Sequence, residues 1–217
     1  MKRILLGAGL CSLALAVAPA AAQVQGLPVY NSGVPRGIGI YADAGFPNED
    51  AGKGTALGVT GKAGLGLFGV TATLASFNPD GPAGSNVSVG GSLNYRLFGG
   101  PLVPLTVTLQ GGVGYVKPDT PAGDVTLWHF PISVGFALVI PNPALAIKPW
   151  LAPRVDILRT SDGTSDTRTK FALSGGLELN LLNGFGLHAA YDLVTGTPGT
   201  PGVFGLGAHY SFRVPGL

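Results

Sequence analysis

The 217-residue chain combines 36 glycines with a charged fraction of only 11%. After its first 22 residues it has no apolar run of the roughly 20 residues that a transmembrane helix needs, which excludes a helical membrane protein. The 13 Lys and Arg face 11 Asp and Glu, and two of the basic residues, Lys2 and Arg3, lie in a segment that we expect to be removed. The mature chain then has no net charge, so its charge gives no indication of nucleic acid as a partner.

Residues 1–22 have the pattern of a cleaved signal peptide. Lys2 and Arg3 precede an apolar stretch at 4–17, and small alanines at 20–22 stand before Gln23. The single cysteine, Cys11, lies inside this segment, and Leu10 before it does not suit lipid attachment. The mature chain of about 195 residues therefore has no disulfide and no thiol nucleophile, and it is long enough for one barrel.

Residues 23–36 contain Pro and Gly without a clear period. We assign them to a periplasmic N-terminal segment, with folding into a barrel lumen as the alternative. Residues 37–212 then alternate in ten segments, joined in turn by long polar loops and short turns. These segments lie near 37–46, 54–64, 68–77, 86–98, 104–116, 125–140, 145–158, 169–181, 185–194 and 202–212. Residues 213–217 form a C-terminal tail.

The alternation is clearest between Lys170 and Leu181. Odd positions there are apolar or glycine and even positions are small, polar or charged, as a period of two requires for two faces of one strand. None of the ten segments carries a charge on its apolar face, where a charge at the bilayer midplane would cost about 2–4 kcal/mol. Aromatic residues gather near both ends of the segments, as at two membrane interfaces. The pattern predicts an all-β, closed antiparallel transmembrane β-barrel of about ten strands, with eight as the alternative.

The last segment ends in Ala208, His209, Tyr210, Ser211 and Phe212. Together with the signal peptide and the alternating strands, this ending resembles the small outer-membrane β-barrel proteins of Gram-negative bacteria, a group that includes the OmpW-like, OmpX-like and opacity-type barrels. Those barrels have eight strands, and the tail after Phe212 is a second departure. The resemblance implies insertion by the outer-membrane assembly machinery and nothing specific about a ligand.

Three inward-facing residues near the end of the chain form a candidate metal site. Hairpin register sets Glu178 opposite His188, and His188 opposite His209, with neighbouring side chains about 5 Å apart. Two imidazoles and a carboxylate can hold a transition metal. The alternative is a lumenal network of hydrogen bonds and ion pairs, which buried polar groups in a narrow barrel need.

A second group lies nearer the loop end of the barrel. We expect Asp156 to sit across from His129, with Arg154 two residues away and Lys170 on the next strand. Opposite charges in one cross-section would fill the lumen. This lumenal charge cluster is either structural or a selectivity constriction.

Pro131, Pro149 and Pro153 interrupt two neighbouring strands, and we expect Pro131 to lie close to Pro153. Proline removes a donor from the hydrogen-bond ladder and is rare in interior strands. The three prolines mark either a bulge at the edge of the membrane or a lateral seam through which a lipophilic molecule passes between wall and lumen.

The sequence has neither a Gly-x-Ser-x-Gly nor a His-Glu-x-x-His motif and no phosphate-binding loop, so we expect no enzyme and no cofactor. We expect a structural envelope protein of the outer membrane with a lumen filled by side chains. The alternatives are a narrow channel or lateral conduit for small or hydrophobic solutes, and an outer-membrane enzyme or lumenal metal site. The expected partners are outer-membrane lipids, lipopolysaccharide and the assembly machinery, without nucleic acid, and the expected state is a monomer.

Overall fold

The computed structural model describes residues 23–81, 84–100, 103–118, 125–143, 145–161, 164–196 and 199–212. The predicted signal peptide at 1–22 and the tail at 213–217 lie outside these residues. Eleven strands and one 3-10 helix make up the described chain. They are β1 Gly37–Pro47, η1 Glu49–Ala51, β2 Gly54–Leu65, β3 Phe68–Pro79, β4 Asn86–Gly100, β5 Val103–Val116, β6 Thr126–Leu138, β7 Ile140–Pro141, β8 Leu145–Ser161, β9 Ser165–Leu181, β10 Phe185–Thr195 and β11 Gly202–Phe212. Among the described residues, no helix has the length and apolar character needed to span a bilayer.

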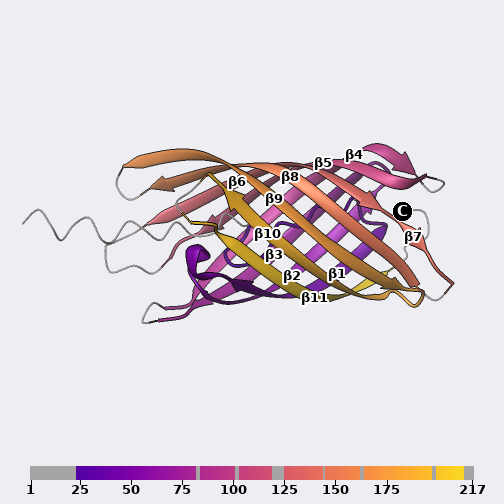
Figure 1. Cartoon of the computed structure of the whole chain (residues 1–217), viewed down its shortest axis with the longest axis horizontal. Helices are drawn as coiled ribbons and strands as arrows, with labels where there is room; N and C mark the ends of the chain where they lie inside the picture. Colours follow the sequence, from indigo (N-terminus) through magenta and orange to yellow (C-terminus); the bar gives the residue numbers. More distant parts are fainter. Residues whose placement is uncertain are drawn as a thin grey trace, which may run out of the picture.

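The strands close into an antiparallel barrel (Figure 1). Each strand pairs with its neighbours in the chain except that β6 does not pair with β7, β1 pairs with β11, and pairing between β6 and β8 completes the circle. The short strand β7 follows β6 after one residue and pairs with the same partner, β8. Counted along the wall, β6 and β7 are one strand, so the barrel has ten strands. The predicted fold class is confirmed with ten strands, and the alternative of eight is wrong.

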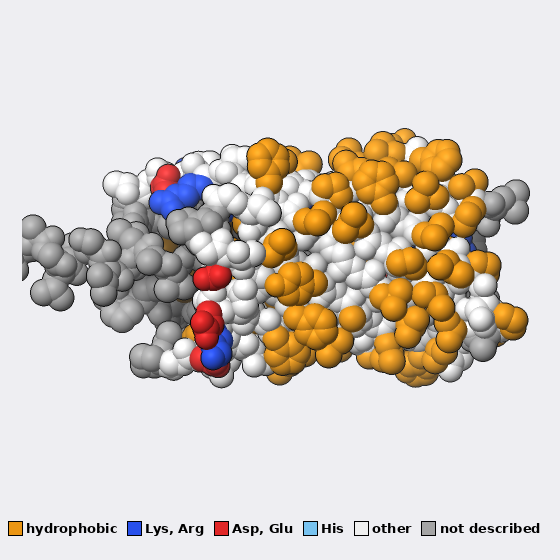
Figure 2. All heavy atoms as spheres, in the orientation of Figure 1, with side chains coloured by type: hydrophobic (Ala, Val, Ile, Leu, Met, Phe, Trp, Pro, Cys, Tyr) orange, Lys and Arg blue, Asp and Glu red, His pale blue; other side chains and the backbone are white. Residues whose placement is uncertain are grey.

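The outer wall exposes its large apolar side chains. Leu57 is 62% exposed, Leu74 56% and Phe171 70%, and the alternate residues between them point inward. Figure 2 shows apolar side chains covering much of the wall, whereas most of the charged side chains in view gather at one end, beyond the apolar surface. Water would strongly disfavour so much exposed apolar area, and hydrocarbon would not. The outer wall therefore has the surface of a barrel surrounded by lipid.

Strands β8 and β9 are longer than the sequence pattern predicts. The pattern predicts a loop at residues 159–168, but β8 continues to Ser161 and β9 begins at Ser165. Cross-strand pairs continue to the end of the hairpin, where Ser161 faces Ser165. The prediction is wrong here because it relied on an apolar face. Residues beyond the membrane surface have no apolar face, although their backbones still pair. The extension gives Arg159 a place on the wall.

Residues 23–36, which we call the lumenal segment, lie inside the barrel. Leu27 is 2% exposed, and Val29 and Asn31 are each 1% exposed. The segment starts beside Gly114, near the loop end of β5, and Pro35 lies beside Gly64, near the turn end of β2. It therefore runs down the lumen before the chain turns into β1. Of the two placements that the sequence allowed, the structure has the lumenal one and not the periplasmic lead-in.

Candidate functional site in the barrel lumen

Glycines of the wall make room for the backbone of the lumenal segment. A methyl group at Gly114 would overlap the carbonyl oxygen of Gln23, and one at Gly64 would overlap that of Pro35. The same holds for Gly45 against the Gly26 carbonyl oxygen. These three glycines belong to three different strands, β5, β2 and β1. The inner wall is thus shaped around the lumenal segment along the length of the barrel.

Polar side chains of the wall hold the lumenal segment in place. Gln110 Nε2 donates to the Tyr30 carbonyl oxygen at 2.9 Å, and Asn31 Nδ2 donates to Ser133 Oγ at 2.8 Å. The Val29 N–H donates to the carboxylate of Asp192 at 3.2 Å. Hydrogen bonds of this kind are worth most where water is excluded, because an unpaired buried group is costly. The segment is therefore fixed by specific partners as well as by shape.

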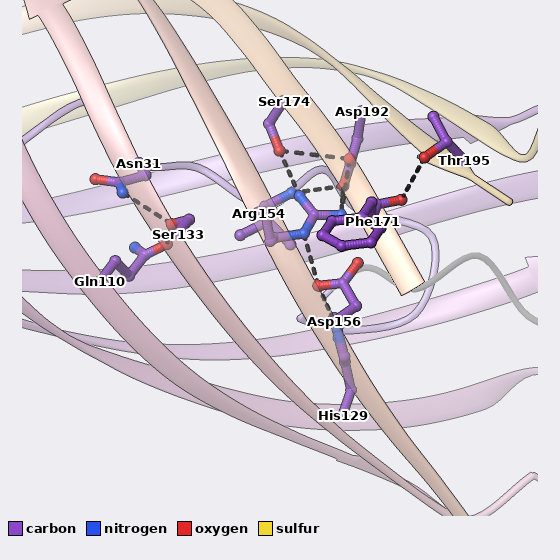
Figure 3. A network of polar contacts seen from close by, with 11 residues as sticks. Asn31, Gln110, His129, Ser133, Arg154, Asp156, Phe171, Ser174, Asp192 and Thr195 are labelled. Atoms are coloured by element: carbon purple, nitrogen blue, oxygen red, sulfur yellow. Dashed lines mark hydrogen bonds and ion pairs between the residues drawn. The ribbon is translucent and has the colours of Figure 1, made fainter. Parts of the chain in front are cut away.

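Arg154 is the centre of a buried ionic cluster (Figure 3). Its Nε donates to Asp156 Oδ1 at 2.7 Å, and its Nη2 donates to Asp192 Oδ1 at 2.9 Å. Nη1 donates to Ser174, and His129 Nε2 lies 2.9 Å from Asp156 Oδ1. We call these five residues the Arg154 cluster. Since Asp192 also accepts from Val29, the cluster joins β6, β8, β9 and β10 to the lumenal segment.

The sequence identified three of these five residues. It paired Asp156 with His129 and Arg154, but it named Lys170 as the fourth member. Lys170 does face Asp156 in the strand register, yet the described residues give it no hydrogen bond or ion pair with the cluster. Asp192 and Ser174 take that place because they face each other across β9 and β10. The sequence did show an acidic residue, Asp192, at an inward position of β10. Which residue it pairs with could not be predicted, because the pairing depends on the register of the strands.

A second ionic group lies nearer the turn end. Lys148 Nζ donates to Glu178 Oε2 at 3.1 Å, and Ser32 of the lumenal segment donates to the other oxygen of Glu178. The Lys62 ammonium lies 3.7 Å from the centre of the Tyr41 ring, a cation–π contact. Glu178 thus has a cationic partner and a hydroxyl donor, one from the wall and one from the lumenal segment.

The two histidines form a chain of hydrogen bonds that ends on a carboxylate. His188 Nε2 donates to Asp43 Oδ1 at 2.6 Å, and the Nδ1 atoms of His188 and His209 are 3.2 Å apart. With one proton on the His188 ring, its Nδ1 accepts and His209 Nδ1 donates. His209 Nε2 lies 3.0 Å from the Asn180 amide. The contacting atom of that amide is Oδ1, an oxygen that only accepts, so this hydrogen bond needs a proton on His209 Nε2.

The candidate metal residues are neighbours but do not converge on one point. The register places Glu178 opposite His188, as predicted, whereas the partner of His188 on β11 is Gly207 and not His209. Glu178 points to Lys148 and Ser32, and His188 points to Asp43. Within the described residues, no group of three His, Cys, Asp or Glu could hold a metal ion. The geometry is that of a lumenal polar network.

The three prolines differ in what they do to the wall. Pairing of β5 with β6 passes from Gly111↔Ile132 to Gly114↔His129, a gap that includes Pro131. Pairing of β6 with β8 is likewise missing between Ser133↔Arg154 and Phe136↔Leu151, a gap that includes Pro153. Pro149 pairs with Leu177 without a break. In the register Pro131 faces Asp156, three residues along β8 from Pro153, and each of the two prolines interrupts one side of β6.

Little open space remains where the lumenal segment meets the wall. A cavity lined by Tyr30, Thr60 and Thr73, among others, has a volume of about 20 Å³. A cavity needs at least about 10–15 Å³ to hold one water molecule, so this one has room for a single water. Side chains and the lumenal segment therefore fill this part of the barrel.

Comparison with known proteins supports the fold. No protein-family model and no curated protein matches the sequence. Among solved structures, the β domain of the Bordetella autotransporter BrkA is similar with a TM-score of 0.53 and 16% identity, over 81% of this chain and 98% of that chain. The N-terminal β-barrel domain of Pseudomonas aeruginosa OprF has a TM-score of 0.40 and 14% identity, over 81% of this chain and 96% of that chain. The outer membrane enzyme PagL has a TM-score of 0.40 and 11% identity, over 80% of this chain and 99% of that chain. The predicted resemblance to small outer-membrane barrels is confirmed as one of fold.

Proposed function

We propose that this protein is a structural, non-enzymatic component of the bacterial outer membrane whose barrel is closed by its own lumenal segment. One observation carries the proposal: wall glycines and wall polar groups are fitted to the backbone of residues 23–36. A pore for solutes would need open space along the axis, and here the lumenal segment takes up the space that the walls of a small barrel leave. The exposed apolar wall supports the membrane location.

Electrical recording tests the closed lumen. The full mature chain, inserted into a planar lipid bilayer, should give no stable conductance steps, and a conducting porin added afterwards shows that the bilayer can report them. Steady steps from the protein itself would contradict the proposal. A gel comparing boiled and unboiled samples of the same preparation must show a compact, fast-running unboiled band, which establishes that a folded barrel was measured.

The expected partners follow from this location. We infer that the outer-membrane assembly machinery inserts the chain, that it works as a monomer, and that lipids and lipopolysaccharide surround its wall. A monomer should give a single mass for one chain plus its detergent belt in light scattering. A mass for two or more chains would contradict this part of the proposal.

A lateral conduit for hydrophobic molecules is the second candidate, and the interrupted ladders beside Pro131 and Pro153 favour it. Missing ladder bonds on both sides of β6 would make this strand the easiest one to part from its neighbours. Hydrogen–deuterium exchange in detergent should then be fast at residues 129–133 and 150–154. Uniform protection of these residues, at the level of β2 and β3, would contradict the conduit.

A further inference from the structure

Arg159 occupies an unusual place on the barrel wall. In β8 the odd-numbered residues point outward, since Leu151 is 49% exposed while Arg154 and Asp156 are buried. Arg159 has the parity of Leu151 and is exposed. Among the described strand residues it is the one charged side chain at an outward position. Hydrocarbon excludes a guanidinium, so this position must lie at or beyond the level of the lipid headgroups.

Arg159 is part of a groove on the outer wall. The register of β6 with β8 pairs Trp128 with Arg159 and Thr126 with Ser161. Together with Phe130, these residues line a groove of about 480 Å³. The rings of Trp128 and Phe130 lie nearly parallel, at 7° and with centres 6.2 Å apart. The groove therefore combines one cation, two hydroxyl groups and an aromatic surface.

The height of the groove follows from its aromatic residues. Trp128 also contacts Tyr115 of β5, with ring centres 4.8 Å apart, so three aromatic side chains meet at the loop end of the wall. Aromatic side chains of this kind prefer the boundary between headgroups and hydrocarbon. Because Arg159 pairs with Trp128, its guanidinium lies at the same boundary. Outer-membrane barrels have their short turns on the periplasmic side and their longer loops on the cell-surface side, so we place the loop end at the cell surface.

The guanidinium of Arg159 is available to a ligand. Within the described part of the chain it forms no ion pair, and its Nη2 donates a long hydrogen bond of 3.4 Å to Ser165 Oγ. Arg168 on the next strand is different, since its Nε donates to Asp166 Oδ2 at 2.7 Å. A planar guanidinium beside hydroxyl donors suits the oxygens of a phosphate.

We propose that this groove binds a phosphate group of the lipid A part of lipopolysaccharide. Arg159 donates to the phosphate oxygens, the hydroxyls of Thr126 and Ser161 donate from either side, and Phe130 contacts the sugar and the start of an acyl chain. Charge complementarity and the height on the wall both favour an anionic lipid headgroup. The inference rests on the proposed outer-membrane location but not on whether the lumen is closed.

Titration of the full mature chain in detergent tests the site. The probe is purified lipid A carrying its phosphates, and the signal is the emission of Trp128; Trp150, the other tryptophan, is buried in the lumen. Arg159→Gln should weaken binding about tenfold, the effect of losing one charge-assisted contact of about 1.4 kcal/mol. Arg168→Gln is the matched control and should stay within about twofold of the parent.

The ligand is varied as well as the protein. Lipid A without phosphates should bind the parent and Arg159→Gln equally and weakly. The comparison of the two lipids on the parent alone tests the proposal even if Arg159→Gln fails to fold. Equal affinity of Arg159→Gln and the parent for phosphorylated lipid A would overturn the proposal, and so would an equal loss in Arg168→Gln. Displacement of the lipid by millimolar inorganic phosphate would assign the site to free phosphate instead. Conductance is recorded separately, so evidence against the closed lumen is distinguished from evidence against this phosphate site.

Discussion

Two arginine–aspartate pairs in this barrel have nearly the same geometry and opposite surroundings. Arg154 and Asp156 are two residues apart on β8, and Asp166 and Arg168 are two residues apart on β9. In each pair the arginine Nε donates to a carboxylate oxygen at 2.7 Å. The side chains of the first pair are 0% exposed, whereas those of the second are 65% and 57% exposed. Distance alone therefore says little about what an ion pair contributes.

The difference lies in what each charge would meet without its partner. Water solvates Asp166 and Arg168 whether or not they are paired, so their contact contributes little. Asp156 and Asp192 meet only protein, and they depend on Arg154 for compensation. The Arg154 cluster therefore determines how the strands and the lumenal segment fit together, and the exposed pair does not.

Replacing Arg154 should destabilise the barrel more than a change on the outer wall or at the rim. Arg154→Leu leaves two buried carboxylates without their cation and should lower the free energy of unfolding by about 3–5 kcal/mol. Urea unfolding in lipid vesicles, followed by the loss of the fast-running band, measures it. A loss below about 1 kcal/mol would mean that water reaches the cluster and that the lumen is not closed there.

A lysine on the outer wall should cost slightly less. Val59 is 54% exposed in the middle of β2, so Val59→Lys should destabilise the barrel in lipid by about 2–4 kcal/mol. Thr55→Lys is the matched control, because it lies on the same face of β2 near the rim, where the cost falls to about 0–1 kcal/mol. Equal costs at the two positions would contradict a membrane around the wall.

The outer wall was predictable because its constraint is local. Each strand must keep charge off one face, and a period of two shows this in the residues of that strand alone, as between Lys170 and Leu181. The outward position of Arg159 was missed because the apolar face of β8 ends before it. Only the pairing of Arg159 with Thr167 shows that this residue belongs to the strand.

The lumen was less predictable because its contacts depend on register to the residue. The sequence places His188 opposite His209, but its partner is Gly207, and the two rings meet diagonally. The lumenal segment shows no period because each of its residues meets a different part of the wall. The only sign of the segment in the strand sequences is a set of inward glycines that leave room for it. The two-residue alternation alone does not distinguish these glycines from others.

Two glycines of β2 show the difference between a glycine that makes room for the lumenal segment and one that does not. A methyl group at Gly64 would overlap the Pro35 carbonyl oxygen, whereas one at Gly61 would meet nothing within 4 Å. Gly64→Ala should displace the lumenal segment and cost about 1–3 kcal/mol, the usual range for overpacking. Gly61→Ala should be neutral or slightly stabilising, by up to about 1 kcal/mol, because it restricts the unfolded chain. Unfolding in vesicles compares them, and similar values would mean that the segment does not occupy the lumen at this level.

The exposed pair gives the smallest effect and completes the comparison. Arg168→Gln removes an ion pair with the same 2.7 Å distance as the buried one, yet it should change the free energy of unfolding by less than about 0.5 kcal/mol. Added salt should reduce even this difference, because exposed charges are screened over about 10 Å at 0.1 M. The unfolding midpoint of Arg168→Gln at low and high salt measures both. A cost near that of Arg154→Leu would contradict the argument that burial makes the two pairs differ.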